Sequence, residues 1–261
     1  MRHLAEGGSD KRAMAKIITV TGVHLGSGAS TIAANVAVLL AQDGRRVALV
    51  DCAISTPTQH LLFGLTKGDC QQSLNDFLLG RCALSGAAIV PNLACPAGRL
   101  FVIPANAEVA DRGQALRQPY DFDLLDGGYR DLVETLNLDV LIIDAEVGLH
   151  ESTMASLVSS EAILAVIQLD LQQYPGIGIM LHVAERLGIS HKAFVVNNTA
   201  SLYDPDNVRA TVEQAFGWKV TGVLPYCDEL MALGSGSIFV LRFPDHAMTA
   251  AFRQIADALM A

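Results

Sequence analysis

The sequence Gly22-Val23-His24-Leu25-Gly26-Ser27-Gly28-Ala29-Ser30-Thr31 joins a short apolar run, Ile17–Val20, to a helical pattern that starts near Ile32. Its small residues allow backbone N–H groups to turn toward a common point, and the N-terminus of the following helix adds partial positive charge. These properties suit the binding of a phosphate group. A plain glycine-rich turn between a strand and a helix has a similar sequence, so both interpretations stay open on the loop alone.

The end of this loop departs from the usual phosphate-binding pattern, which closes on Gly-Lys-Ser/Thr. Ala29 stands where the lysine is expected, whereas Ser30 and Thr31 are present. In the usual pattern the lysine reaches the β- and γ-phosphates, and the hydroxyl group binds Mg²⁺. We therefore expect a backbone cradle over Gly26–Thr31 that lacks its cation.

Seven apolar runs alternate with helical patterns along the chain. Continuous runs rich in Val and Ile are typical of strands that are covered on both faces. Their alternation with helices predicts an α/β fold with a doubly wound, mostly parallel sheet. The expected strands are Ile17–Val20, Val47–Asp51, Leu100–Pro104, Val140–Asp144, Ile163–Leu169, Ala193–Asn197 and Val220–Leu224.

The same survey predicts one folded domain over residues 16–261, preceded by a flexible segment over residues 1–15. Residues 106–128 are expected to form an irregular, acidic surface excursion. The last helix carries an apolar stripe, which we expect to pack on the core because its polar face lacks the Lys and Arg enrichment of membrane-surface helices. The stripe consists of Met248, Phe252, Ile255 and Leu259.

Composition narrows the class of protein. Of the 261 residues, 51% are hydrophobic and 17% are charged, which excludes an intrinsically disordered chain. The formal net charge of -9 disfavours nucleic acid as a partner, because nucleic-acid-binding domains normally present a basic surface. No apolar run approaches the roughly 18 to 20 residues of a transmembrane segment. The five cysteines show no CxxC spacing, so we expect them to be reduced and the protein to be cytoplasmic.

From Lys16 onward the sequence resembles the ParA/MinD family of deviant Walker-A ATPases, whose loop reads KGGVGKTT. The segment HLGSGAST, His24–Thr31, aligns with that loop without a gap. Further segments resemble family motifs in the same order along the chain: the second strand at Arg46–Asp51, helical segments at Leu61–Leu65 and Ser73–Leu78, the third strand at Leu100–Ala105, the Walker B strand at Asp139–Asp144, the VVN segment at Val195–Asn197 and the G-IPY turn at Gly222–Tyr226.

The resemblance implies a homodimer that binds ATP or ADP with Mg²⁺ and positions other cellular machinery through an unidentified protein partner. It places the phosphates on Gly26, Ser27, Gly28, Ala29, Ser30 and Thr31. It also implies that Asn197 and Pro225 flank the base. Ser30 would ligate Mg²⁺, and Asp51 and Asp144 would hold the waters of the ion from the ends of neighbouring strands.

Three positions that the family uses for catalysis lack their functional groups here. The resemblance places the signature lysine on His24, the loop lysine on Ala29 and the water-positioning aspartate on Ala53. Phosphoryl transfer depends on placed positive charge and an oriented nucleophile, so we expect weak or absent hydrolysis with nucleotide binding at reduced strength. Glu146, after the Walker B strand, is a weak candidate for the missing carboxylate, and an ordinary surface glutamate is the alternative.

Two functions therefore stay open. The first is a nucleotide-dependent switch of the kind that the family provides. The second is a pseudo-ATPase scaffold that does not depend on nucleotide, for example in pilus assembly, since degenerate Walker-A loops resemble the TadZ and CpaE branch. The apolar segment 233–243 would then be either a partner surface or a helix-packing segment. An iron–sulfur reductase is disfavoured because residues 144–153 contain no cysteine for a four-thiolate cluster.

Overall fold

The computed structural model describes residues 15–93, 98–106, 113 and 121–261. In these residues seven strands form one sheet in the order β3-β2-β4-β1-β5-β6-β7, and every neighbouring pair is parallel. The predicted fold class is confirmed, and each predicted strand is present with its ends shifted by at most two residues. The strands are β1 (Lys16–Gly22), β2 (Arg46–Asp51), β3 (Arg99–Ile103), β4 (Val140–Asp144), β5 (Ala162–Ile167), β6 (His191–Thr199) and β7 (Lys219–Pro225).

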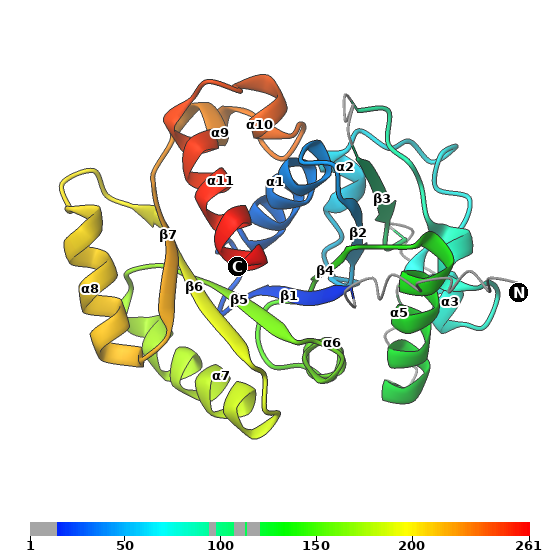
Figure 1. The fold of residues 1–261 in the computed structure, drawn as a ribbon, viewed down its shortest axis with the longest axis horizontal. Helices are drawn as coiled ribbons and strands as arrows, with labels where there is room; N and C mark the ends of the chain where they lie inside the picture. The colour runs from blue at the N-terminus through cyan, green and yellow to red at the C-terminus, as the bar shows by residue number, and fades with distance from the viewer. Residues whose placement is uncertain (1–14, 94–97, 107–112, 114–120) are drawn as a thin grey trace, which may run out of the picture.

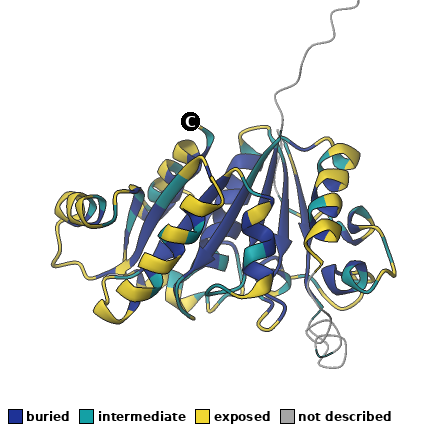
Figure 2. Cartoon of the chain, turned by 90° about the horizontal axis from the view of Figure 1, so that it is seen from below, coloured by how far each residue is buried: buried dark blue, intermediate teal, exposed yellow. Residues whose placement is uncertain are grey.

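Helices cover both faces of the sheet (Figure 1). One face carries α1 (Ala29–Gln42), α2 (Gln59–Leu62), α9 (Asp228–Ala232), α10 (Phe239–Arg242) and α11 (Ala247–Met260). The other face carries α3 (Leu74–Leu78), η1 (Leu84–Ala87), α5 (Phe122–Leu136), α6 (Glu151–Val158), α7 (Tyr174–Arg186) and α8 (Pro205–Phe216). The short turn η2 (Leu171–Gln173) leads into α7. The strands between these layers are buried, and the exposed residues lie on the outer sides of the helices (Figure 2).

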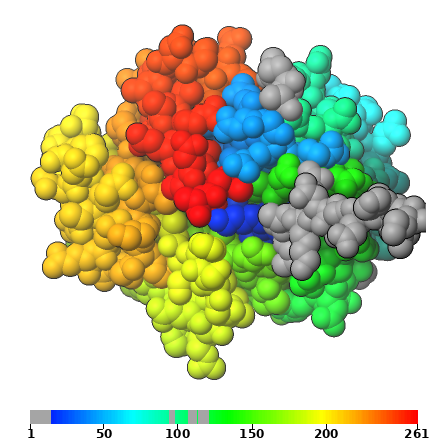
Figure 3. All heavy atoms as spheres, in the orientation of Figure 1, coloured from blue at the N-terminus to red at the C-terminus, as the bar shows by residue number. Residues whose placement is uncertain are grey.

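Most residues of the first helix are buried, and α11 packs along it; the red spheres of α11 lie beside blue spheres on the face shown in Figure 3. Small residues such as Ala33, Ala34 and Ala37 leave room for this close packing, and all three are fully buried. The predicted stripe on α11 is confirmed as a core-facing stripe, since Met248, Phe252, Ile255 and Leu259 are all buried. This packing fixes the position of α1 and therefore of the loop at its N-terminus.

One prediction about the chain's course is wrong. Residues 106–128 were expected to be irregular, but α5 begins at Phe122. Asp121 caps this helix, since its side chain accepts a hydrogen bond from the backbone N–H of Leu124 at 3.0 Å. The apolar spacing that marks the helix, Leu125, Tyr129 and Leu132, extends beyond the end of the acidic stretch. Residues 107–112 and 114–120 lie outside the described residues, as do residues 1–14 of the predicted N-terminal segment and Cys95.

The central residues of segment 233–243 are buried inside the molecule. Ile238, Phe239 and Val240 are buried in the cluster formed by α1 and α11, which confirms the helix-packing interpretation for these residues. Across the described parts of the chain, no helix is long and apolar enough to cross a membrane.

Candidate nucleotide-binding site

The glycine-rich loop follows β1 and ends where α1 begins. Gly26 and Gly28 adopt φ values of 80° and 91°, which non-glycine residues rarely adopt. Gly28 is the N-cap residue of α1 and has no side chain to cap the helix, and Ser27 Oγ accepts a hydrogen bond from the first helical N–H, that of Ala29, at 3.4 Å. The other backbone N–H groups in the first turn of α1 can donate hydrogen bonds to an anion at the loop.

Three side-chain amides, one from β6 and two from the segment that follows β5, contact the loop. Asn197 Nδ2 donates a hydrogen bond to the backbone oxygen of Ser27 at 2.7 Å. Gln168 Nε2 donates to the backbone oxygen of Gly26 at 3.3 Å, and the amide of Gln173 contacts Nε2 of His24. A Cβ atom at Gly28 would collide with the Asn197 amide, so glycine is required there by contact as well as by backbone angle. The loop is thus prearranged by the fold.

Two adjoining cavities of about 250 and 180 Å³ lie beside this loop and share Gly26, Gly28, Thr31, Leu62 and Ser235. The larger cavity has a mostly apolar wall, formed by Ile32, Leu62, Leu230, Met231, Leu233 and Phe252, with Asn197 and Asn198 at one side. The smaller cavity follows the loop itself and is lined by every residue from Leu25 to Thr31, together with Ala53, Ala145 and others. Among the described residues no Lys, Arg or His lines either cavity.

Some of the predicted site residues line these cavities and others do not. All six loop residues from Gly26 to Thr31 line the smaller cavity, and Asn197 lines the larger one. Pro225 ends β7 and lines neither cavity. Leu230 and Met231 of α9, which follows it, line the larger cavity instead. Glu146 is also outside the lining, and its Oε2 accepts a hydrogen bond from Ser152 Oγ at 3.0 Å.

Two carboxylic acids lie side by side at the carboxyl ends of β2 and β4. Asp51 and Asp144 are direct neighbours in the strand register, and both side chains are fully buried. The Asp144 carboxylate accepts hydrogen bonds from Ser30 Oγ at 3.1 Å and from Gln59 Nε2 at 2.7 Å. The Asp51 carboxylate accepts from three backbone N–H groups, those of Ala53, Thr58 and Gln59, at 3.0 to 3.1 Å.

Burial makes ionisation of this pair costly. Desolvation raises the pKa of Asp51, and the neighbouring Asp144 raises it further. Desolvation also raises the pKa of Asp144, against the opposing effect of its hydrogen bonds from Gln59 and Ser30. A cation placed between the carboxylates would favour their ionised forms.

The residues at this position fit a magnesium ion. Mg²⁺ prefers hard oxygen ligands and retains several of its waters, and the pair offers carboxylate oxygens beside the Ser30 hydroxyl. The ion would be held by Ser30, with Asp51 and Asp144 accepting hydrogen bonds from its waters. When bound, it would supply positive charge to the phosphates of a nucleotide.

Gln59 belongs to this site, and its role could not be predicted from the sequence. Its side-chain amide joins Asp144 to the backbone oxygen of Ser30, at 2.7 and 3.1 Å, while its own backbone N–H donates to Asp51. Its Oε1 atom is buried and has no partner among the described residues. No motif marks this glutamine, because its position depends on how the chain folds back after β2.

A parallel α/β sheet with a glycine-rich loop after the first strand and a buried aspartate at the end of an adjacent strand defines a P-loop-type nucleotide-binding domain. Residues 18–237 match the family described as the CobQ/CobB/MinD/ParA nucleotide binding domain, and the chain belongs to this family.

Individual relatives agree with this assignment. The chain is 28% identical over 248 residues to an uncharacterized ATP-binding protein of Methanocaldococcus jannaschii, a match that covers 95% of this chain and 88% of that protein. It is 28% identical over 152 residues to the antiactivator FleN of Pseudomonas aeruginosa, covering 58% of this chain and 50% of FleN.

Solved structures show the same fold. The cell division ATPase MinD of Pyrococcus furiosus superposes with a TM-score of 0.81 at 22% identity, covering 95% of this chain and 99% of that one. The septum site-determining protein MinD of Pyrococcus horikoshii, complexed with Mg-ADP, gives a TM-score of 0.79 at 21% identity, covering 94% and 95%.

Proposed function

We propose that this protein binds ATP or ADP with Mg²⁺ in the two cavities beside the glycine-rich loop and acts as a homodimeric switch that positions or regulates other cellular machinery. The observation that carries this proposal is the backbone cradle, which lines a cavity that no Lys, Arg or His of the described residues lines. The buried Asp51–Asp144 pair lies behind this cavity and is joined to it by the hydrogen bond from Ser30 to Asp144. The cradle supports binding, and the missing cations support weak or absent hydrolysis.

The shapes of the two cavities suit the two ends of a nucleotide. Residues Gly26–Thr31 present backbone N–H groups to phosphates, as helix N-termini do in other phosphate sites. The apolar wall that includes Leu230, Met231 and Phe252 suits the face of a base, with Asn197 and Asn198 beside it. The complex of a relative with Mg-ADP supports the same assignment.

Weak hydrolysis follows from the chemistry of phosphoryl transfer. The reaction depends on positive charge at the transferred group and on an oriented water. Ala29 and Ala53 line the smaller cavity and supply neither. His24 contacts Gln173, and Glu146 bonds Ser152, so neither of these two residues replaces them in the described arrangement.

A second copy of this chain is the partner that best covers the cavity. Large apolar side chains stand exposed on the loops and short helices that follow the carboxyl ends of the strands, namely Leu25, Leu171, Leu202, Tyr203, Tyr226 and Met231. These loops surround the nucleotide cavity, because parallel strands end at one edge of the sheet. A two-fold dimer that brings these edges together would bury them and enclose the nucleotide.

Other parts of the proposal rest on composition and on the relatives. The free cysteines among the described residues support a cytoplasmic location, and the net charge of -9 argues against a nucleic-acid partner. Names such as antiactivator and septum site-determining protein support a regulatory or positioning role that acts through a protein partner.

Light scattering tests the switch. The proposal predicts that ATP with Mg²⁺ shifts the protein toward the dimer and that Ser30→Ala weakens the shift. The exposed variant Ser190→Ala, at the amino end of β6 and away from the proposed dimer surface, does not weaken it. A strict monomer with and without nucleotide would remove the mechanism of the switch.

One observation favours a second candidate, a scaffold that does not depend on nucleotide. Both oxygens of Asp144 already accept hydrogen bonds from Ser30 and Gln59, so the site is satisfied by the protein's own groups. Such a protein would use the fold and the dimer surface to hold partners, for example in pilus assembly. Purified protein without co-bound nucleotide, and without binding on titration, would favour this candidate.

A further inference from the structure

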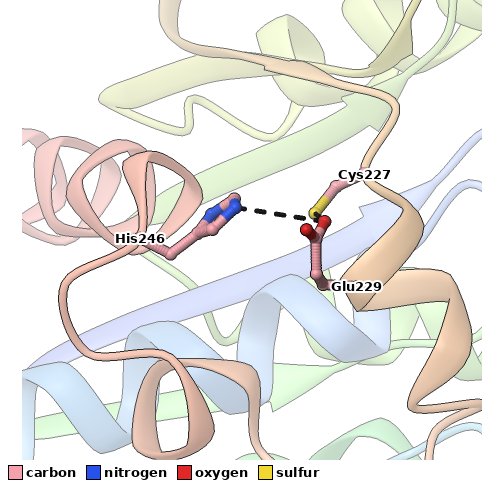
Figure 4. A group of neighbouring side chains, drawn as sticks. All are labelled: Cys227, Glu229 and His246. Carbon is pink, nitrogen blue, oxygen red and sulfur yellow. Dashed lines mark hydrogen bonds and ion pairs between the residues drawn. The ribbon is translucent and has the colours of Figure 1, made fainter.

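Three metal-ligating side chains gather between β7 and α11, outside the nucleotide cavity (Figure 4). Cys227 and Glu229 come from the turn after β7 and the first turn of α9, and His246 precedes α11. Their sulfur, oxygen and nitrogen atoms all lie within 4.8 Å of one another. Cys227 Sγ is 3.3 Å from Glu229 Oε2, and His246 Nε2 is 4.0 Å from the same oxygen.

We propose that Cys227, Glu229 and His246 bind a zinc ion. A thiolate, an imidazole and a carboxylate are the donors that Zn²⁺ uses in proteins, with bonds of about 2.0 to 2.3 Å. Around one tetrahedral ion such atoms lie about 3.4 to 3.6 Å apart. The sulfur–oxygen pair, at 3.3 Å, already has nearly this spacing, so the imidazole is the group that needs to approach, from 4.0 Å to about 3.5 Å of the carboxylate oxygen.

Access to the site also suits a metal. The Cys227 side chain is buried, whereas the side chains of Glu229 and His246 are 51% and 34% exposed. An ion can therefore enter from solvent, and water can fill its fourth position, as in zinc sites with three protein ligands.

One hydrogen bond determines which ring nitrogen of His246 carries the proton before zinc binds. His246 Nδ1 accepts from the backbone N–H of Met248 at 3.0 Å, so the neutral ring carries its proton on Nε2. Zinc takes the lone pair of Nε2, the ring proton moves to Nδ1, and the cap bond to Met248 is lost. The Cys227 thiol becomes a thiolate and releases its proton to the buffer. Two anionic ligands then balance the charge of Zn²⁺.

The ion would tie together two walls of the nucleotide cavity. Cys227 and Glu229 lie next to Leu230 and Met231, and His246 lies at the start of the helix that carries Phe252. All three of these apolar residues line the larger cavity. Zinc would thus link the β7–α9 turn to α11 from the outer side.

Titration of Zn²⁺ into the reduced, metal-free full-length chain tests the proposal. We expect one zinc per chain, and Co²⁺ in its place should give a thiolate-to-cobalt charge-transfer band. His246→Asn is the informative variant, because asparagine keeps an N-cap acceptor for Met248 while removing the metal ligand. We expect His246→Asn, Cys227→Ser and Glu229→Gln each to weaken zinc binding by about tenfold to 100-fold or more.

Matched controls come from elsewhere in the chain. Cys82→Ser and His182→Asn remove a half-buried thiol and an exposed imidazole far from the cluster in sequence, and they should bind zinc as the parent does. The charge-transfer band should be absent in Cys227→Ser and present in Cys82→Ser. The proposal is overturned if the parent retains no zinc after dialysis against micromolar Zn²⁺, or if the three ligand variants bind as tightly as the parent. Glu229→Gln changes an exposed side chain, so a folding defect in another variant leaves the test intact.

Discussion

The side-chain amide of Gln59 donates a 2.7 Å hydrogen bond to Oδ2 of Asp144, the aspartate at the end of β4. The same nitrogen lies 3.1 Å from the backbone oxygen of Ser30, so a neutral amide bridges the loop and the acidic strand end. Usual P-loop proteins place a lysine and a metal ion in this region. In this chain hydrogen bonds from Gln59 and Ser30 hold the carboxylate in position.

Replacement of Gln59 by leucine should therefore destabilise the protein. Asp144 would lose a buried hydrogen bond to one carboxylate oxygen, a loss that costs about 1 to 3 kcal/mol. The free energy of unfolding from urea titration measures this change. Gln214→Leu, on the exposed side of α8, serves as the control and should change stability by less than about 0.5 kcal/mol. Equal stability of both variants would show that the bridge does not matter.

The buried carboxylate pair should give stability a distinct dependence on pH. Burial and Asp144 raise the pKa of Asp51 to about 8, compared with about 3.9 for an ordinary aspartate. Between these values the folded protein keeps a proton that the unfolded chain releases. The stabilising contribution of this proton is therefore complete below about pH 4 and is lost as the pH rises toward about 8.

Urea unfolding with a metal chelator between about pH 5 and pH 8 tests this dependence. Asp144→Asn removes a carboxyl group whose own pKa is raised by burial, and with it the neighbouring charge that raises the pKa of Asp51. Its stability should therefore fall less with rising pH than that of the parent. Asp131→Asn, which changes an exposed aspartate on α5, should follow the parent. Parallel profiles for the parent and Asp144→Asn would contradict the coupling.

Most of the fold could be predicted because buried parallel strands leave a direct signal. Val140–Asp144 is one apolar run closed by an aspartate, and the strand has the same ends. The start of α5 could not be predicted in the same way. Phe122 and Leu124 in its first turn are exposed, and its buried apolar residues begin only at Leu125. Segment 233–243 was ambiguous, because a short apolar run does not show whether a neighbouring helix will cover it.

The sequence predicts candidate site residues that belong to a local motif, but not residues that reach the site from distant segments of the chain. The loop Gly26–Thr31 and the strand-end position of Asp144 follow from local pattern. The roles of Gln59 and Gln173 are evident only in the folded structure, where distant segments come together, because no sequence motif marks either glutamine. The resemblance predicts that Asn197 flanks the base, which stays a prediction, and the structure shows that its side chain donates a hydrogen bond to the Ser27 carbonyl.

Restoring the loop lysine should tighten nucleotide binding. Ala29 lines the smaller cavity, so Ala29→Lys places a cation beside the phosphates. A charge-assisted contact of about 1.5 to 3 kcal/mol corresponds to roughly a tenfold to 100-fold gain in affinity for ATP. Ala250→Lys adds the same charge on the exposed side of α11 and should have little effect. An unchanged affinity of Ala29→Lys would place the phosphates elsewhere.

Hydrolysis should be far slower than in relatives that keep both lysines and the second aspartate. Ala29→Lys alone should add little turnover, because the water-positioning carboxylate is still missing. The combined His24→Lys, Ala29→Lys and Ala53→Asp variant should release phosphate at a measurable rate. A phosphate-release assay compares the three proteins. Brisk ATPase activity in the parent, abolished by Asp144→Ala, would instead indicate a cation outside the residues described here.

Calorimetric titration with ATP and Mg²⁺ tests the central claim, which is that the loop binds nucleotide without its lysine. The parent should bind, and Gly28→Val should abolish binding, because residue 28 has a φ of 91° and a side chain there meets the Asn197 amide. Ser30→Ala, which leaves the loop backbone intact, should weaken binding, and Gly127→Val on the exposed side of α5 should bind as the parent does. Circular dichroism confirms that each variant is folded. Binding heat in the parent that is lost in Gly28→Val and kept in Gly127→Val is the predicted result, and no detectable heat from the parent at millimolar ATP would contradict it.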